Sequence, residues 1–260
     1  YIHERNKGID DDVLHRNLDG SFKRPFWITN LALSYLRRWD KKWHRFLWNR
    51  PKTIVSANTP TSARTLASAH GWPTLNSWVA GETEFRDAAK KAAGVGVLWP
   101  AIDPQAWPVE PTSEELNVWA TFELKPTKPY LVTIGRACFM KGGFEALTVA
   151  QASSMPLVHV GGGETEAMKK KATELSVELI IMPRINELEL VSLVRHAHAL
   201  IAVARTEGFG LTPMEAVMVN TPALVVDEAG FTHTITDGLN GRRLPWPTDE
   251  DSIQQWVEAI

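Results

Sequence analysis

From residue 130 onward, short apolar runs alternate with stretches in which apolar residues recur at helical spacing. The apolar runs predict strands at residues 130–134, 157–160, 177–182, 199–203 and 223–226. The stretches between them predict helices at residues 143–152, 164–174, 186–196 and 212–219. Nearly continuous apolar strands that alternate with helices are typical of a parallel sheet covered on both faces. We therefore expect a doubly wound α/β domain, whose ligands bind at the carboxyl ends of the strands.

The first hundred residues show the same alternation over a shorter length. Strands are predicted at residues 53–57, 75–79 and 95–98, and helices at residues 64–69 and 82–93. This pattern resembles half of a second α/β domain, with its first half missing. Prolines crowd residues 100–129, which indicates a linker without continuous secondary structure. We expect a partial Rossmann-like domain at residues 1–110, a linker at 111–129 and a second Rossmann-like domain at 130–260.

Composition narrows the class of protein. Hydrophobic residues make up 44% and charged residues 22% of the 260 residues, which is ordinary for a soluble globular protein. The formal net charge of -2 does not indicate a polyanionic partner, and the single cysteine, Cys138, excludes a disulfide framework. No apolar run approaches the ~18–20 residues that span a bilayer, and no signal peptide is evident, so we expect a cytoplasmic protein. The chain starts at Tyr1 rather than Met, which is typical of a processed or truncated chain.

Residues 205–215 carry the first chemical signal, with Glu207 and Glu215 on either side of a glycine-containing loop. A predicted strand precedes this segment and a predicted helix begins within it. The unpaired N–H groups at a helix N-terminus form an anion site, and Gly208 and Gly210 let the backbone approach a ligand closely. Two carboxylates beside such a site can bind the hydroxyls of a sugar and of a ribose. The alternative is a surface acid and a helix-capping acid.

Glu207 and Glu215, seven residues apart around Gly-Phe-Gly, resemble the Glu-x7-Glu motif of the family 4 retaining glycosyltransferases of GT-B fold. The resemblance extends to residues 134–142, with a Gly-Arg and a Lys-Gly pair, to the glycine-rich residues 160–164, and to residues 222–227 and 237–241. It is dense over residues 130–260 and loose over the first half.

This resemblance implies the fold and the reaction. It implies two Rossmann-like domains, of which residues 130–260 bind the nucleotide sugar and residues 1–110 lie on the acceptor side. The reaction implied is metal-independent retaining transfer of a hexose to a glycan, a glycolipid or another hydroxyl acceptor. The donor would be a nucleoside diphosphate sugar of UDP or GDP type, and no further cofactor is implied.

Arg136 and Lys141 follow the first strand of the second domain. An Arg fork and a Lys charge suit a diphosphate that gains negative charge as the sugar departs, and stabilising that charge is the electrostatic catalysis the reaction needs. The alternative is two ordinary surface residues. With the resemblance, the expected catalytic residues are Glu207, Lys141, Arg136 and His3. The expected nucleotide- and sugar-binding residues are Gly208, Phe209, Gly210, Leu211, Glu215, Gly162, Gly163 and Arg184.

The resemblance also bears on the roles of two histidines, His3 and His233. The opening Tyr-Ile-His-Glu is similar to a strand end of the family's first domain, which implies that His3 faces the transferred sugar; the alternative is a structural histidine. Family members often place a glutamate after paired glycines that follow the last strand. Here Gly230 stands alone and His233 lies near the glutamate position. We therefore expect recognition of the donor sugar to differ from that of common members.

Residues 26–50, bounded by Pro25 and Pro51, predict a long helix. Its apolar stripe consists of Leu31, Tyr35, Trp39, Trp43, Phe46 and Leu47, and basic residues crowd the remaining surface. Three interpretations stay open: a core-packing helix with a solvated basic face, a helix at a membrane surface, and a nucleic-acid contact.

Other classes of protein compete with the glycan or glycolipid enzyme. A DNA-modifying glycosyltransferase would perform the same chemistry on a nucleic-acid acceptor. A non-catalytic module would bind the nucleotide sugar without turnover. A GT-B phosphorylase is disfavoured because no lysine lies in a recognisable motif for attaching pyridoxal.

Overall fold

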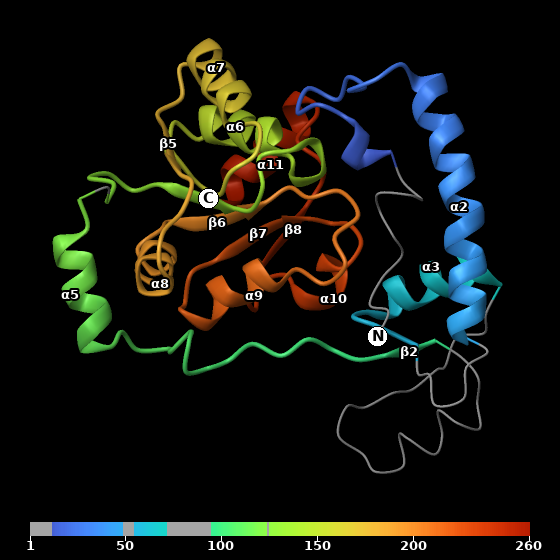
Figure 1. Cartoon of the computed structure of the whole chain (residues 1–260). Coiled ribbons are helices and arrows are strands. Elements are labelled where there is room, and N and C mark those ends of the chain that lie inside the picture. The colour runs from blue at the N-terminus through green and yellow to red at the C-terminus, as the bar shows by residue number, and fades with distance from the viewer. Residues whose placement is uncertain (1–11, 49–54, 72–94, 124) are drawn as a thin grey trace.

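The computed structural model describes residues 12–48, 55–71, 95–123 and 125–260 (Figure 1). A larger unit carries the C-terminal sheet, and a smaller one contains a long helix and a short sheet. Within the described residues, no helix is both long and apolar enough to cross a membrane.

A six-stranded parallel sheet forms the centre of the C-terminal part, in the order β5-β4-β3-β6-β7-β8. Its strands are β3 (Leu131–Ile134), β4 (Leu157–Val160), β5 (Leu179–Met182), β6 (Ala199–Ala202), β7 (Ala223–Val226) and β8 (Gly241–Leu244). The five predicted strands are confirmed within two residues at each end. Edge strand β8 was not predicted, because Arg242 and Arg243 interrupt its apolar run.

Helices cover both faces of this sheet. Figure 1 shows α6 (Gly143–Ala152), α7 (Thr165–Leu175) and α11 (Glu250–Ala259) on one face, and α8 (Glu187–Arg195), α9 (Leu211–Met218) and α10 (Phe231–Thr234) on the other. Fully buried Trp256 belongs to the core under α11, and the Tyr130 hydroxyl in the opposite core donates to the Leu193 carbonyl at 2.6 Å. The predicted doubly wound α/β fold and its four helices are confirmed.

Helix α5 (Ser113–Thr121) lies inside the predicted linker, so the expectation of irregular structure is wrong for these residues. The Thr112 hydroxyl caps the helix by accepting from the Glu115 N–H at 3.1 Å. Buried Glu115 then pairs with Arg195 of α8, with Nε and Oε1 2.7 Å apart. A capped first turn and an ion pair to α8 outweigh the flanking prolines. The domain boundaries at residues 110 and 130 stay predictions.

The N-terminal part contains a parallel pair, β1 (Ser56–Ala57) and β2 (Gly96–Val97), and two helices, α2 (Phe26–Trp48) and α3 (Pro60–His70). A short 3-10 helix, η1 (Val13–His15), precedes them. The predictions of strands near residues 53–57 and 95–98 and of a helix at 64–69 are confirmed. The predicted strand at 75–79 and helix at 82–93 lie outside the described residues.

Helix α2 turns its apolar stripe to solvent. Each of the following side chains is more than half exposed: Leu31, Tyr35, Trp39, Trp43 and Phe46. The buried positions are Thr29, Leu33 and His44 instead. The interpretation of α2 as a core-packing helix is therefore wrong for the described side chains of the stripe.

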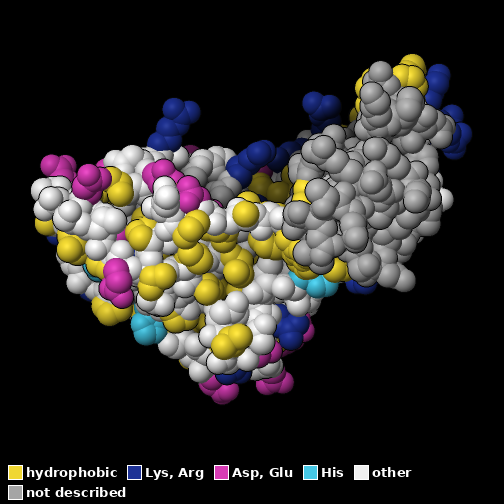
Figure 2. All heavy atoms as spheres, turned by 90° about the horizontal axis from the view of Figure 1, so that it is seen from below, with side chains coloured by type: hydrophobic (Ala, Val, Ile, Leu, Met, Phe, Trp, Pro, Cys, Tyr) yellow, Lys and Arg dark blue, Asp and Glu magenta, His cyan; other side chains and the backbone are white. Residues whose placement is uncertain are grey.

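Residues 98–112 run from β2 to α5 along one side of the C-terminal part (Figure 1). Seen from below, this side carries many hydrophobic side chains among polar ones (Figure 2). Within this segment Trp107 is buried in the core beneath α8, while Trp99 and Val109 are exposed. The segment thus connects the two parts of the chain and also packs on the main sheet unit.

Candidate active site at the carboxyl edge of the sheet

The order of strands reverses between β3 and β6, which are neighbours in the sheet. Loops that leave such neighbours run in opposite directions and open a crevice at the carboxyl edge. Lys141, in η2 (Phe139–Lys141), follows β3, and Glu207 follows β6. Lys141 Nζ and Glu207 Oε2 lie 2.6 Å apart. The fold thus brings together two of the predicted catalytic residues at the place where ligands of doubly wound sheets bind.

A cavity of about 290 Å³ opens at this pair, near the lower end of the ~300–1,000 Å³ typical of ligand sites. Lys141 and Glu207 line it from the C-terminal part, and Asn58 and Pro100 line it from the N-terminal part. Its walls also include Thr133, Ile134, Ala204, Phe209, Leu211 and Thr212. Both parts of the chain therefore shape the candidate site.

Arg205 fixes the Lys141 loop to the Glu207 loop. Its backbone N–H donates to the Met140 carbonyl at 2.8 Å, and its side chain donates to the Phe139 carbonyl at 2.7 Å. The guanidinium also pairs with Glu145 and lies 3.9 Å from the centre of the Phe139 ring. Sequence reasoning missed this positioning residue, although it stands only two residues before Glu207.

The Glu207 loop is held in a constrained backbone. Thr206 has a φ of +55°, which is uncommon for a residue with a β-branched side chain. The Glu207 carbonyl accepts from the Gly230 N–H at 2.9 Å. A Cβ at Gly230 would lie 2.5 Å from the Gly208 backbone, so this glycine is required by packing. The lone Gly230 thus supports the loop that carries Glu207.

The N-terminus of α9 borders the same cavity. Gly210, with a φ of +89°, precedes the first helical residue, and Gly210, Leu211 and Thr212 line the cavity. Among the residues that the structure describes, no side chain caps this end of the helix. Its first N–H groups, with the positive end of the helix dipole, therefore lie where the sequence predicts an anion site. Buried Phe209 also lines the cavity, and Leu211 is exposed.

Glu215 lies one turn further along α9 and is not among the residues that line this cavity. The side chain is partly buried, and burial, followed by the nearby carboxylate of Glu187, raises its pKa. Glu187 begins α8, directly after the loop that carries Arg184. Glu215 therefore faces the region between α8 and α9 rather than the Lys141–Glu207 pair.

Four other predicted residues lie at the same sheet edge but outside the cavity lining. Arg136 and Arg184 are exposed in the loops after β3 and β5. Gly163 packs closely on the first of these loops, because a Cβ there would lie 2.8 Å from Arg136 Cγ. Apart from its two chain neighbours, no atom of the described residues lies within 4 Å of the position that a Cβ of Gly162 would occupy. His3 lies outside the described residues.

The N-terminal part contributes polar groups that sequence reasoning did not assign. Asn58 Oδ1 is buried and has no hydrogen-bond partner within the described residues, although Asn58 lines the cavity. The His233 Nε2 lies 2.8 Å from the Thr61 hydroxyl, and the Trp99 ring lies 6.0 Å from that of Phe209. Asn58 could have been found from its position directly after β1, at the carboxyl end of a strand.

The architecture and this site define a class of protein. A doubly wound domain carries a Lys–Glu pair and a helix N-terminus at its switch point, opposite a smaller α/β unit. This is the arrangement of a GT-B-type protein. Residues 120–260 match the family of group 1 glycosyl transferases, and the chain belongs to this family.

Curated relatives match a smaller segment. The chain is 34% identical over 87 residues to the O-antigen chain mannosyltransferase RfbU of Salmonella typhimurium, covering 34% of this chain and 24% of that protein. It is 26% identical over 88 residues to the alpha-1,3/1,6-mannosyltransferase alg-2 of Neurospora crassa, covering 34% of this chain and 18% of that protein. The matched segments thus span a quarter or less of these relatives.

Solved structures confirm the fold over a longer stretch. HepE of Anabaena, in complex with UDP and glucose, superposes with a TM-score of 0.61 at 14% identity, covering 84% of this chain and 56% of that chain. A glycosyltransferase of Rickettsia africae gives a TM-score of 0.58 at 14% identity, covering 79% of this chain and 52% of that chain. The chain therefore spans about half the length of these two structures.

Proposed function

We propose that this chain provides the donor site of a retaining glycosyltransferase, which moves a sugar from a nucleoside diphosphate sugar to a hydroxyl acceptor without a catalytic metal. The observation that carries the proposal is the Lys141–Glu207 pair, 2.6 Å apart at the switch point of the sheet beside the N-terminus of α9. Membership of the group 1 family supports the same activity.

The residues predicted to contact the diphosphate and the sugar take separate roles in this proposal. Lys141 and Arg136 hold the diphosphate, and the first N–H groups of α9, at Leu211, bind its oxygens. As the bond from the sugar to phosphate breaks, negative charge grows on the leaving phosphate, and the Lys141 charge stabilises it. Because Glu207 is acceptor-only when ionised, it binds hydroxyls of the transferred sugar while orienting Lys141.

The remaining residues hold the nucleotide and the far side of the sugar. Glu215 accepts hydrogen bonds from the ribose hydroxyls, and the backbone around Arg184 contacts the base. Gly162 leaves room for the phosphates, and Gly163 lets the glycine-rich loop approach the Arg136 loop closely. His3 lies outside the described residues, and its contact with the transferred sugar stays a prediction. Closure of the N-terminal part over the donor excludes water from the reacting centre.

The chemistry of the donor can be narrowed further. A pocket with one lysine, one carboxylate and a helix N-terminus suits a hexose linked to a diphosphate. RfbU and alg-2 are named as mannosyltransferases, whereas HepE was solved with UDP and glucose. We accordingly propose a UDP- or GDP-linked hexose, with mannose and glucose as the first sugars to test.

The experiment separates an enzyme from a binding module. Thermal stabilisation of the chain by UDP-glucose, UDP-N-acetylglucosamine, GDP-mannose and the free nucleotides shows which donor binds. Slow hydrolysis of the stabilising donor, with release of the nucleoside diphosphate, then shows turnover without an acceptor. Binding without hydrolysis would favour the non-catalytic module. If none of these ligands shifts the melting temperature, the proposed donor site is wrong.

We also propose that α2 contacts an anionic membrane surface. Five basic residues and one acidic residue lie on this helix, beside the exposed aromatic stripe described above. Aromatic side chains that enter the headgroup region, combined with basic residues that attract anionic lipids, are typical of interfacial helices. An acceptor carried by a lipid would then be presented at the membrane.

Vesicle sedimentation tests the membrane proposal. Binding to phosphatidylglycerol-containing vesicles, but weakly to pure phosphatidylcholine, is expected, with loss in a Trp39→Ser, Trp43→Ser variant. A matched control, Leu116→Ser, removes an exposed apolar side chain of α5. Salt-sensitive DNA binding that depends on Arg38 and Arg45, without vesicle binding, would instead favour the DNA-modifying enzyme.

A further inference from the structure

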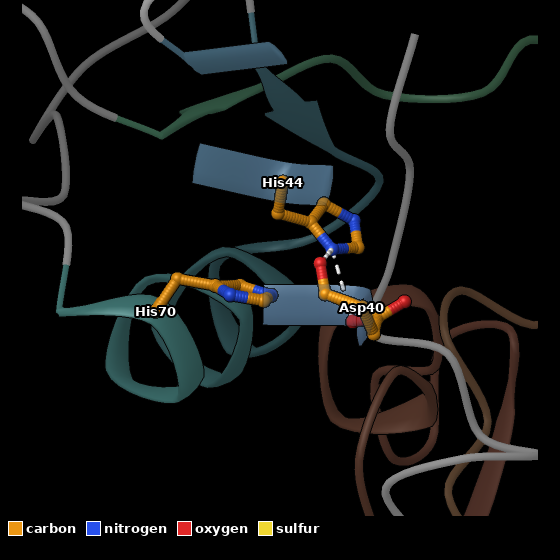
Figure 3. A group of neighbouring side chains, drawn as sticks. All are labelled: Asp40, His44 and His70. Carbon is orange, nitrogen blue, oxygen red and sulfur yellow. Dashed lines mark hydrogen bonds and ion pairs between the residues drawn. The ribbon is translucent and has the colours of Figure 1, made fainter. Parts of the chain in front are cut away.

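Helix α2 has a polar inner face at the end that crosses α3. Asp40 and His44 are four residues apart and therefore project from the same side of α2. His70 is the last residue of α3. The three side chains come together between the helices, with the His70 ring pointing toward the other two (Figure 3). None of the three lines the candidate active site.

The three groups are close enough to share one ion. His44 Nδ1 lies 2.9 Å from Asp40 Oδ2, and the ring centres of His44 and His70 are 4.4 Å apart. One ligand atom from each residue can be chosen so that all three lie within 4.8 Å of one another. Tetrahedral zinc holds its nitrogen and oxygen ligands roughly 3.3 Å apart. Because the atoms lie within 4.8 Å of one another, reaching that spacing takes a change of at most about 1.5 Å in any pair distance.

Burial makes the cluster chemically unusual. The side chains of Asp40 and His44 are only 10% and 11% exposed, and His70 Nε2 is buried. A carboxylate removed from water needs a compensating positive charge or hydrogen bonds, and His44 Nδ1 already lies 2.9 Å from Asp40 Oδ2 and 3.0 Å from the Asp40 carbonyl oxygen. A divalent cation supplies that charge and at the same time uses the lone pairs of two neutral imidazoles. Two helices that are joined by packing alone need neither a buried carboxylate nor a pair of imidazoles beside it.

We propose that Asp40, His44 and His70 form a zinc site that joins α2 to α3. One carboxylate and two imidazoles are a ligand set that zinc commonly takes, with a fourth position left for water or another ligand. Lys41, Arg45, Ser68 and Gly71 line a hollow beside His70, which gives water access to this end of the cluster. The site is separate from the proposed donor cavity, and the zinc takes no part in sugar transfer.

Zinc bound here would anchor the helix that carries the exposed aromatic stripe. Asp40 and His44 lie in the same turns of α2 as Trp39 and Trp43. Fixing the inner face to α3 sets the direction in which the outer face points. The zinc site thus gives α2 a defined orientation, whatever surface its outer face contacts.

Zinc binding is tested on tag-free protein that has been treated with a chelator. Competition with a chromophoric zinc chelator should give one zinc per chain and a higher melting temperature with zinc than without it. Asp40→Asn and His70→Gln should each lower the affinity by at least about a hundredfold, since loss of even an outer-shell partner costs about 10- to 100-fold. Cobalt should give the visible absorption of a tetrahedral site in the original chain and not in these variants.

Two further variants separate a ligand from a packing residue. His70→Cys keeps a zinc ligand and should retain tight binding, whereas His70→Gln should lose it even where both variants fold. A double His196→Gln, His198→Gln variant removes an exposed histidine pair elsewhere and should bind zinc like the original chain. Absence of stoichiometric zinc binding would overturn the proposal. So would binding that survives in Asp40→Asn and His70→Gln but is lost in the control.

Discussion

The hydroxyl of Thr59 donates a hydrogen bond to the carbonyl of Gly208 at 3.0 Å, across 149 positions of sequence. Thr59 is completely buried, and its oxygen also caps α3 by accepting from the Ser62 N–H at 3.1 Å. One side chain therefore begins a helix of the N-terminal part and holds the loop that follows Glu207. The geometry of the candidate active site depends on this contact between the two parts of the chain.

Replacing Thr59 by Val tests this contact. Valine keeps the shape but removes the cap and leaves the Gly208 carbonyl with the longer 3.3 Å bond from the Ser62 hydroxyl. We expect a loss of about 1–2 kcal/mol in the free energy of unfolding, measured by urea denaturation. Thr59→Ser keeps the hydroxyl and should lose less. Equal stability of the Val variant and the original chain would show that the contact does not contribute.

Replacing Lys141 by Met tests the diphosphate role. The change removes the charge while keeping the length of the side chain, so the affinity for the nucleoside diphosphate should fall about 10- to 100-fold, as expected for a lost charge-assisted hydrogen bond. Calorimetric titration measures this affinity. Lys141→Arg keeps the charge and should bind more tightly than Lys141→Met. Unchanged affinity in the Met variant would remove Lys141 from the diphosphate site.

Glu207→Gln is the matched test on the other member of the pair. Glutamine keeps the size of the side chain and its hydrogen-bonding capacity but loses the charge that pairs with Lys141. The nucleoside diphosphate alone should bind within about threefold of the original affinity, because it lacks the sugar that Glu207 is proposed to hold. Donor hydrolysis should fall much further than binding. If the affinity for the nucleoside diphosphate and the rate of donor hydrolysis fell by the same factor, Glu207 would contact the nucleotide rather than the sugar.

The main sheet could be predicted from sequence because its strands are buried on both faces and therefore read as apolar runs. β8 did not follow this rule, since its edge position leaves Arg242 exposed. α5 was missed because prolines surround it, while its capping by Thr112 and its ion pair through Glu115 depend on the folded context. Local pattern thus predicts central elements better than those at the edge.

The candidate site could be predicted only in part. Lys141 and Glu207 follow neighbouring parallel strands, and the carboxyl ends of such strands meet at one edge. By contrast, Asn58, Thr59 and the Thr61–His233 contact require the N-terminal part to pack against the C-terminal loops. No local pattern contains that packing. The outward direction of the α2 stripe could not be predicted for the same reason, because hydrophobic spacing marks a face without showing what covers it.

Acid sensitivity should come partly from His159 in the centre of β4. This side chain is 3% exposed, and its ring nitrogens have no hydrogen-bond partner within the described residues. Burial lowers its pKa from 6.5 to about 4. Between these values the unfolded chain binds a proton that the folded chain does not, so stability falls as the pH drops from above 6.5 toward 4. The loss attributable to this group is up to about 3 kcal/mol.

Urea unfolding of His159→Leu between pH 4 and pH 8 measures that contribution. The variant should lose the part of the pH dependence that lies between about pH 4 and 6.5, and it should not be destabilised at neutral pH, because leucine needs no hydrogen-bond partner. His198→Gln changes an exposed histidine and should keep the original pH profile. If the Leu variant kept that profile, the titrating group would lie elsewhere.

We expect the ionised Glu215 side chain to lower the stability of the folded chain while it contributes to nucleotide binding. Burial and the Glu187 carboxylate raise its pKa, so the folded chain holds this proton to a higher pH than the unfolded chain does. Its contribution to stability therefore declines as the pH rises through the folded-state pKa and is least favourable at neutral pH. Glu215→Gln removes that penalty and should raise the melting temperature at pH 7.5, but not at a pH below 4.5, where the carboxyl is already neutral.

A neutral amide is also a weaker acceptor for ribose hydroxyls, so nucleotide affinity should fall in the same variant. Glu187→Gln serves as the control for affinity, because it removes a nearby carboxylate without changing the proposed ribose ligand, and it should keep the nucleotide affinity. Stabilisation without loss of nucleotide affinity in Glu215→Gln would show that Glu215 is a buried carboxyl of the α8–α9 contact and not part of the donor site.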